Sequence, residues 1–332
     1  MNKVCIITDA WLPQINGVVR SIQYTVEHLI NKGYNVTIVH PELFKTFSCP
    51  GYNEIKLSIF PDVSNYLDEA NFIHIATEGP LGFSARGYCI RKRYKFNTAY
   101  HTRFPEYIKE YYKIPTWLTY PLFRWFHKKA DNVSVSTESL KSELTQKGFK
   151  NVSIWKKGVD TNKFQPVYNR NYYEYKRPIY LNVGRVSTEK NIEVFLQTNL
   201  PGTKVIIGDG PALKDLKSKY PDVVFTGPKS GDDLVKAYSS ADIFVFPSLT
   251  DTLGLVNLEA LACGLPVVAF EQDSLKEIVV NGYTGYLAKS NEDLQTCCLS
   301  ALNIDKNDCR SFAEENDWAQ ATNQFIKNLV NK

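Results

Sequence analysis

Residues 178–191 read PIYLNVGRVSTEKN, an apolar run that ends in a glycine and two cations. The run 178–183 has the length and composition of a buried β-strand. Gly184 follows it directly, and Arg185 and Lys190 place two positive charges beyond its carboxyl end. In open parallel sheets ligands bind at that edge, where helix N-termini offer unpaired N–H groups to anions. The stretch therefore predicts a diphosphate site or, alternatively, two solvated charges at the start of a helix.

The same alternation of apolar runs and helix-like stretches continues along the whole chain. Strand patterns that alternate with helix patterns are typical of a parallel sheet covered by helices on both faces. The rhythm restarts after a polar, tyrosine-rich segment at 165–178, which predicts two doubly wound α/β domains. The expected strands lie in residues 3–8, 34–41, 72–77, 96–102, 132–137, 178–184, 203–210, 222–228, 242–248 and 265–270.

Composition places the chain among globular proteins. It has 332 residues, of which 43% are hydrophobic and 22% charged, enough for about two domains. The apolar run in residues 1–8 is too short for a signal peptide, and no window approaches the roughly 18 apolar residues of a membrane-spanning helix. The seven cysteines are odd in number and none forms a spaced CxxC pair, which favours reduced thiols. We therefore expect a cytoplasmic protein.

Charge is unevenly distributed along the chain. Residues 1–166 carry 22 Lys and Arg against 14 Asp and Glu, whereas the remainder carries 17 against 21. A cationic first half suits an anionic partner, either an acidic membrane or nucleic acid. The four cations between Arg91 and Lys95, with the aromatic stretch 117–129, suggest peripheral contact with the inner face of a membrane. The alternative for 117–129 is an ordinary amphipathic helix packed on the sheet.

A second chemical pattern lies at 248–270, SLTDTLGLVNLEALACGLPVVAF. Glu259 falls on the same helix side as Leu255 and Ala262, which form an apolar face. A half-buried carboxylate there needs hydrogen-bond donors, and a ribose supplies two hydroxyls. Asp251 stands before this helix, and the amides that follow it can face an anion or sugar hydroxyls. The alternative is that Asp251 only caps the helix.

These patterns together resemble the retaining glycosyltransferases of family 4. The resemblance rests on Asp251 and Glu259 with the intervening TLGLVNL, on the GR(x)4K element at 184–190, and on GDGP at 208–211. The family usually has glutamate where this chain has Asp251. A narrower branch, which contains GDP-mannose-dependent α-mannosyltransferases and is similar to sulfolipid-forming glycosyltransferases, is resembled in residues 8–21, 74–89, 98–107 and 157–166.

The resemblance implies the GT-B fold, in which two Rossmann-like domains face a central cleft. We expect an acceptor-side domain at 1–166 and a donor-binding domain at 167–310. The remaining segment, 311–332, is expected to form a helix that crosses back to the first domain.

The resemblance also implies a role for each matched position. Arg185 and Lys190 hold the donor diphosphate as it leaves, while Glu259 binds the ribose hydroxyls. The implied catalytic residues are His101, Arg185, Lys190 and Asp251. The implied donor-binding residues are Gly17, Gly184, Gly210, Thr252, Leu253, Gly254, Leu255 and Glu259. Asp9, Trp11 and Arg20 lie at or beyond the carboxyl end of the first strand and are expected to face the acceptor, although Trp11 also suits a core position.

The expected reaction needs little from general acid–base side chains. The sequence offers no convincing carboxylate in the first domain as a nucleophile, so we expect same-face displacement in which the departing phosphate accepts the acceptor's proton. No DxD motif is present, so we expect no metal and no other cofactor. The expected partners are GDP-mannose, with UDP-sugars as the alternative, and a lipid or glycan acceptor.

Three other function classes were weighed against the sequence. A nicotinamide-dependent dehydrogenase needs GxGxxG after its first strand, and residues 9–19 lack that spacing. A nucleic-acid-binding protein would use the basic first half but leaves Glu259 unexplained, so we expect no nucleic-acid partner. A non-catalytic binder of sugar nucleotides remains an alternative at this stage.

Overall fold

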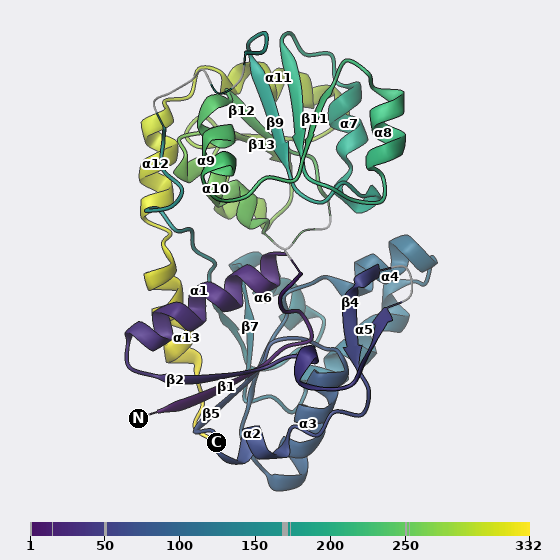
Figure 1. Cartoon of the computed structure of the whole chain (residues 1–332), viewed down its shortest axis with the longest axis vertical. Helices are drawn as coiled ribbons and strands as arrows, with labels where there is room; N and C mark the ends of the chain where they lie inside the picture. Colours follow the sequence, from purple (N-terminus) through teal and green to yellow (C-terminus); the bar gives the residue numbers. More distant parts are fainter. Residues whose placement is uncertain are drawn as a thin grey trace. The chain divides into compact units, whose positions relative to one another are not determined.

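The computed structural model describes residues 2–14, 16–49, 52–167, 172, 174–249, 251 and 253–332. The chain divides into two compact units (Figure 1). The first comprises Met1–Lys157 and Trp318–Lys332, and the second comprises Gly158–Asp317. None of the described helices has both the length and the apolar composition needed to cross a membrane.

The first unit is built on a parallel sheet in the order β2-β1-β5-β6-β7-β8. A separate antiparallel hairpin, β3 with β4, lies outside this sheet. The strands are β1 (Lys3–Ile7), β2 (Asn35–Val39), β3 (Thr46–Cys49), β4 (Tyr52–Ser58), β5 (Phe72–Ile75), β6 (Asn97–Ala99), β7 (Asn132–Val135) and β8 (Val152–Ile154).

Helices cover both faces of this sheet because successive strand residues point to opposite sides. In β1, Val4 and Ile6 pack with the helices α1 and α13, whereas Cys5 and Ile7 pack with α2 and α3. The helices of this unit are α1 (Gly17–Asn31), α2 (Ser64–Asp68), α3 (Pro80–Lys92), α4 (Phe104–Tyr112), α5 (Thr116–His127), α6 (Glu138–Gln146) and α13 (Trp318–Asn328).

The second unit repeats this architecture with a parallel sheet in the order β11-β10-β9-β12-β13-β14. Every residue of β9 is buried, as a strand with helices on both sides requires. Its strands are β9 (Ile179–Val183), β10 (Thr203–Ile207), β11 (Val224–Gly227), β12 (Ile243–Phe246), β13 (Val267–Phe270) and β14 (Gly285–Ala288). Its helices are α7 (Ile192–Gln197), α8 (Leu213–Lys219), α9 (Gly231–Ser240), α10 (Leu255–Ala262), α11 (Asn291–Ala301) and α12 (Lys306–Glu314).

The division between the units lies at Lys157 and Gly158 rather than at residue 166. The reason is the packing of the segment 158–166. Phe164 belongs to the core of the second unit, and Arg310 of α12 donates hydrogen bonds to the carbonyls of Thr161 and Phe164. Residues 311–317 likewise stay with the second unit.

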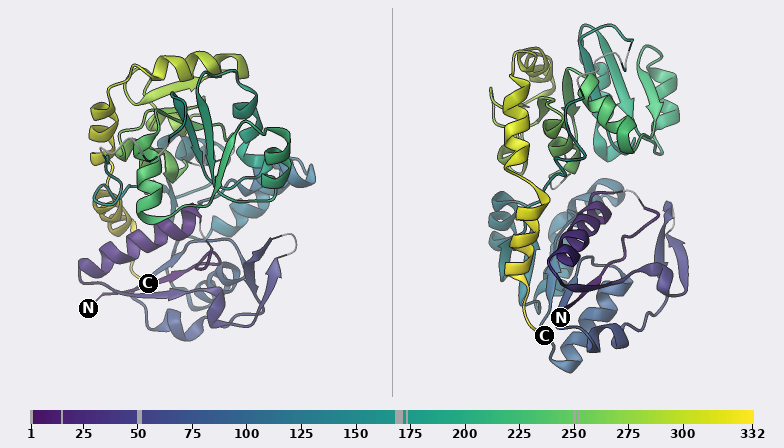
Figure 2. Two further views of the ribbon diagram at one scale, coloured as in Figure 1. Left: turned by 45° about the horizontal axis from the view of Figure 1, so that its top comes forward. Right: turned by 60° about the vertical axis from the view of Figure 1, so that its left-hand side comes forward.

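The last helix, α13, belongs to the first unit, where it lies beside α1 (Figures 1 and 2). The indole of Trp318 stacks on Tyr24 of α1 with ring centroids 5.2 Å apart. At its other end the Asn328 carbonyl accepts hydrogen bonds from Asn97 of β6 and Asn132 of β7. Since Asn328 also donates to Ile154, α13 joins three strands of the sheet.

Candidate functional site

The carboxyl end of β9 brings together the two chemical patterns of the second unit. The Lys190 ammonium lies 2.7 and 2.8 Å from the two carboxylate oxygens of Asp251. Both side chains remain partly exposed, at 22% and 17%. The predicted diphosphate cation and the predicted sugar-binding carboxylate are therefore direct neighbours in the unliganded chain.

A buried network holds the turn that carries Lys190. The 3-10 turn η3 (Thr188–Lys190) contains Glu189, which accepts a 2.5 Å hydrogen bond from Ser187. Asn191 donates to the Pro247 carbonyl, and Gln272 donates to Ser248 in the same loop. Sequence reasoning did not single out these positioning residues; the only signal was a run of polar side chains around Lys190.

Gly210 allows the loop after β10 to pack closely against the loop after β9. Gly184 donates to the Ile207 carbonyl, and Val186 donates to that of Asp209. Gly210 has φ +158°, and a Cβ on it would overlap the carbonyl of Val186. This close approach explains the need for glycine at 210 by backbone packing alone. Arg185, half buried, lies in the same connection directly after Gly184.

The start of α10 carries the remaining predicted donor-binding backbone. Gly254 has φ +74° and precedes the helix, so an added Cβ would clash with the ring of Phe246. Leu253 is buried, and its carbonyl accepts a hydrogen bond from Asn257. Leu255 begins the helix. Thr252 lies outside the described residues.

Glu259 is more deeply buried than the sequence suggested, with 4% of its surface exposed. It lies within α10, and its Oε2 accepts a 3.0 Å hydrogen bond from the hydroxyl of Tyr238 in α9. One donor is therefore supplied by the protein. A buried carboxylate with a hydroxyl donor is a stable arrangement before any ligand binds.

Asp9 has a structural role that the sequence reasoning did not anticipate. Its carboxylate accepts hydrogen bonds from the amides of Leu81 and Gly82 at the start of α3, and from the hydroxyl of Thr77. Burial raises its pKa despite these bonds. Residue 79 has to be glycine, because a Cβ there would overlap the carboxylate of Asp9. Asp9 therefore caps α3, and its expected contact with the acceptor stays a prediction.

The other predicted residues of the first unit lie on different elements. Gly17 begins α1, where the Asn16 side chain caps the amides of Val18 and Val19. Arg20 lies within α1, half buried. Trp11 is partly buried against the core beneath this helix, with its ring centroid 6.1 Å from that of His40.

His101 follows β6 and packs edge-on against Trp155, with ring centroids 5.3 Å apart. Burial and the nearby Lys157 and His74 hold its pKa well below the usual range. The imidazole is therefore neutral at physiological pH. A neutral ring offers one N–H donor and one acceptor nitrogen.

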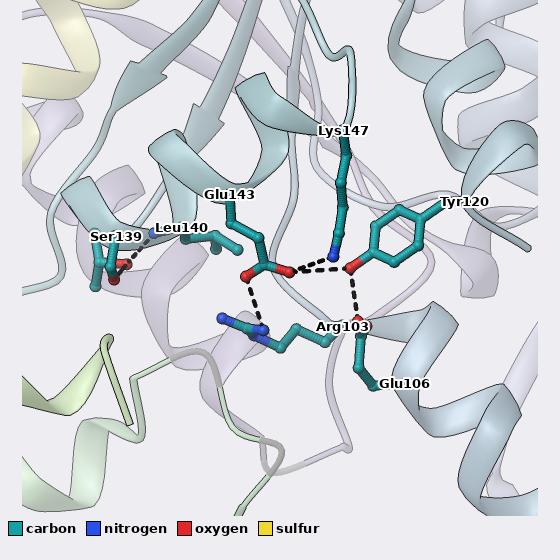
Figure 3. Close-up of polar contacts among 8 residues, drawn as sticks. Arg103, Glu106, Tyr120, Ser139, Leu140, Glu143 and Lys147 are labelled. Atoms are coloured by element: carbon teal, nitrogen blue, oxygen red, sulfur yellow. Dashed lines mark hydrogen bonds and ion pairs between the residues drawn. The ribbon is translucent and has the colours of Figure 1, made fainter. Parts of the chain in front are cut away.

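A polar network in the first unit also escaped the sequence reasoning (Figure 3). The hydroxyl of Tyr120 in α5 donates to Glu106 of α4 at 2.6 Å and to Glu143 of α6 at 3.3 Å. Lys147 and Arg103 pair with the same Glu143 at 2.7 and 2.9 Å. Burial acts to raise the pKa of Glu143, but these cations outweigh it and hold the pKa below its usual value. The network fixes α5 between α4 and α6.

Within the described part of the chain, no three His, Cys, Asp or Glu side chains are grouped as metal ligands.

Comparison with known protein families assigns both halves of the chain. Residues 15–163 match the family described as Glycosyltransferase Family 4, and residues 177–303 match the family described as Glycosyl transferases group 1. The chain is 30% identical to a sulfoquinovosyl transferase of Arabidopsis thaliana, over 94% of this chain and 70% of that protein.

Two further comparisons extend over nearly all of the chain. A GDP-mannose-dependent alpha-mannosyltransferase of Mycobacterium tuberculosis is 28% identical over 87% of this chain and 84% of its own length. Among solved structures, sucrose-phosphate synthase from Thermosynechococcus elongatus superimposes with a TM-score of 0.82 over 98% of both chains, at 19% identity. The latter likeness shows the GT-B fold.

Proposed function

This chain belongs to glycosyltransferase family 4, and from that premise we propose that it transfers a mannosyl group from GDP-mannose to a lipid or glycan acceptor, with retention of configuration. The observation that carries the proposal is the ion pair between Lys190 and Asp251 at the carboxyl end of β9. It sets a cation for a phosphate directly beside a carboxylate for sugar hydroxyls.

In the proposed reaction, the donor diphosphate replaces Asp251 as the partner of Lys190. A diphosphate carries more negative charge than one carboxylate, so it competes well for the ammonium. Arg185 adds a second cation, and both stabilise the charge that develops as the diphosphate leaves. Asp251, once released, accepts hydrogen bonds from hydroxyls of the transferred sugar. The amides at 253–255 donate hydrogen bonds to the same sugar.

The remaining assignments follow the family resemblance. Glu259 binds the ribose, which adds hydroxyl donors to the one that Tyr238 supplies. Gly184 and Gly210 belong to the donor loops, and in the first unit we assign Gly17 and His101 to the donor. The departing phosphate accepts the acceptor's proton, and the reaction proceeds on one face of the sugar without a metal. Arg20 and Trp11 stay assigned to the acceptor.

Transfer of a glucosyl or sulfoquinovosyl group from a UDP-sugar is the second candidate, and the chain is 30% identical to a sulfoquinovosyl transferase. Incubation with a panel of nucleotide sugars and a lipid extract, read by mass spectrometry, tests both. We expect loss of GDP-mannose and a product heavier by one hexosyl group. Turnover of UDP-sugars alone would replace the donor assignment, and turnover of none would favour a non-catalytic binder.

We also propose that the first unit rests on an anionic membrane through α5. One face of this helix is apolar and exposed: Trp117, Leu122 and Trp125 have 71%, 53% and 49% of their surface exposed. Leu122 and Trp125 are three residues apart and are neighbours on the helix surface, and all three side chains fall within about 140° around the helix axis. Aromatic side chains flanked by cations are typical of helices that lie in the plane of a membrane interface.

A cationic groove of about 420 Å³ adjoins that face. Arg124, Lys128 and Lys150 line it, and none of the groove-lining residues that the structure describes is acidic. The Arg124 guanidinium lies over Gly148 and donates to the Lys147 carbonyl, which holds it along the groove wall. The charge of the groove suits the phosphate of an anionic lipid.

Sedimentation with vesicles tests the membrane proposal. We expect binding to vesicles of phosphatidylcholine with phosphatidylglycerol and little binding to phosphatidylcholine alone. The pair Trp117→Ala and Leu122→Ala should abolish binding, whereas Leu299→Ala with Leu302→Ala, also exposed apolar residues, should not. Equal binding by both double variants would contradict the assignment of α5.

A further inference from the structure

The indole of Trp155 is surrounded by three basic side chains in the first unit. The Lys157 ammonium lies 3.4 Å from the ring centroid. The rings of His101 and His74 lie 5.3 and 5.5 Å from it, both edge-on. His74 comes from β5, His101 follows β6, and Trp155 and Lys157 follow β8. We call these four residues the Trp155 cluster.

The cluster is poor in hydrogen-bond acceptors. Both ring nitrogens of His74 and the Lys157 Nζ are buried, and none has a hydrogen-bond partner among the described residues. Helix α13 contributes the phenyl ring of Phe325, whose centroid lies 4.8 Å from those of His74 and Trp155. Glu78, which follows β5, pairs with His127 at 3.1 Å. Among the described residues, Lys157 and His74 are titratable groups that act on His101.

Three bases with buried nitrogen atoms this close together cannot all carry a proton. Each charge disfavours the next, and burial disfavours every one of them. Burial, reinforced by Lys157, lowers the pKa of His74 to about 3. Burial also holds the pKa of Lys157 well below its usual range. Lysine is nevertheless the most basic of the three side chains, and the face of the indole stabilises its cation. The first proton that enters the cluster therefore resides on Lys157.

We propose that Lys157 is a positioning residue for His101: it carries the single proton of the Trp155 cluster, and its charge adds to burial in keeping the His101 imidazole neutral. A neutral His101 keeps an acceptor nitrogen as well as a donor for hydroxyl groups of a substrate. The charge state is a property of the first unit alone. Only its consequence for catalysis rests on the proposed contact of His101 with the donor sugar.

Histidine NMR titration of the ligand-free chain tests the charge state. The chain has five histidines, and His101→Gln identifies the signal of His101. We expect its midpoint to lie well below that of an ordinary histidine in the wild type. In Lys157→Met its midpoint should rise by about one pH unit or more, whereas Lys157→Arg, which keeps the charge, should leave it low.

Lys156→Met is the matched control, because Lys156 is adjacent in sequence but exposed. It should leave the midpoint of His101 unchanged. A wild-type midpoint near 6.5 would overturn the proposal even if Lys157→Met failed to fold. An equal shift in Lys156→Met and Lys157→Met, or no shift in either, would overturn it too.

The pH profile of kcat/KM gives the second readout. Its acid limb should move upward by about one pH unit in Lys157→Met and stay in place in Lys157→Arg. If Lys157→Met only disturbed the packing, kcat/KM would fall at every pH and its acid limb would not move. That result would contradict the positioning role. If the NMR midpoint moves and the limb does not, the contact between His101 and the sugar is wrong, while the effect of Lys157 on His101 stands.

Discussion

Single side chains in the second unit are held in place by contacts within the protein. Lys190 and Asp251 are 61 positions apart in sequence and pair directly. Glu259 is buried on α10 but keeps the hydroxyl of Tyr238 as a donor. The sequence indicated the chemistry of these residues, since cations after a strand and an acid on an apolar helix face need partners. It could not indicate that two of them pair with each other, because that depends on the tertiary fold.

Glu259→Gln should weaken donor binding and leave the fold intact. The substitution keeps the shape but replaces charge-assisted hydrogen bonds to the ribose with neutral ones, which should cost about 1.5–3 kcal/mol in donor affinity. Calorimetric titration of the donor measures this loss. Tyr238→Phe is the control, because it removes one hydrogen-bond donor to Glu259 and keeps the carboxylate. An unchanged affinity in Glu259→Gln would show that the carboxylate serves the α9–α10 contact alone.

At the scale of elements, carboxylates at strand ends serve different purposes that the sequence does not distinguish. Asp9 and Asp251 both follow the pattern of an acid near a strand end, yet Asp9 caps α3 through the amides of Leu81 and Gly82. The interior strands were predicted correctly, and several of them, such as β12 and β13, are continuous apolar runs. The edge strands β8 and β14 and the hairpin of β3 and β4 were missed, since short edge strands have one neighbour and a weaker pattern.

Asp9→Ala should lower the free energy of unfolding by about 2 kcal/mol, because two buried amides of α3 would lose their acceptor. Urea denaturation measures the change. Asp215→Ala, at an exposed position in the first turn of α8, is the control and should change stability by less than about 0.5 kcal/mol. Equal effects of the two substitutions would rule out a capping role for Asp9.

At the scale of the whole molecule, the prediction of two doubly wound α/β units is confirmed, together with the GT-B fold. The boundary was misplaced because composition changes near residue 166, whereas packing changes at Lys157. The first unit is built from two segments of the chain, one before and one after the second unit in sequence. Helix α13 belongs to the later segment, so the first unit is complete only when the end of the chain is in place. Hydrogen bonds from Asn97 and Asn132 to Asn328 fix that helix.

The first unit should lose stability in acid through His74. Its folded pKa is about 3 against 6.5 for an unperturbed histidine, so between these values the unfolded chain binds more protons. Stability should therefore fall as pH drops below 6.5, by up to about 1.4 kcal/mol per pH unit for this residue. His74→Leu should make the fall shallower, as monitored by urea unfolding at several pH values. An identical pH dependence in the variant would show that His74 does not titrate on unfolding as stated.

The central claim, that Lys190 holds a nucleoside diphosphate, is tested most directly by calorimetric titration of GDP and GMP. The second phosphate should make GDP bind about tenfold or more tightly than GMP to the wild type. Lys190→Ala should remove most of that difference without a change in unfolding temperature, whereas Lys219→Ala, which breaks a different ion pair of the second unit, should preserve it. Equal binding of GDP and GMP by the wild type, or an undiminished difference in Lys190→Ala, would contradict the account.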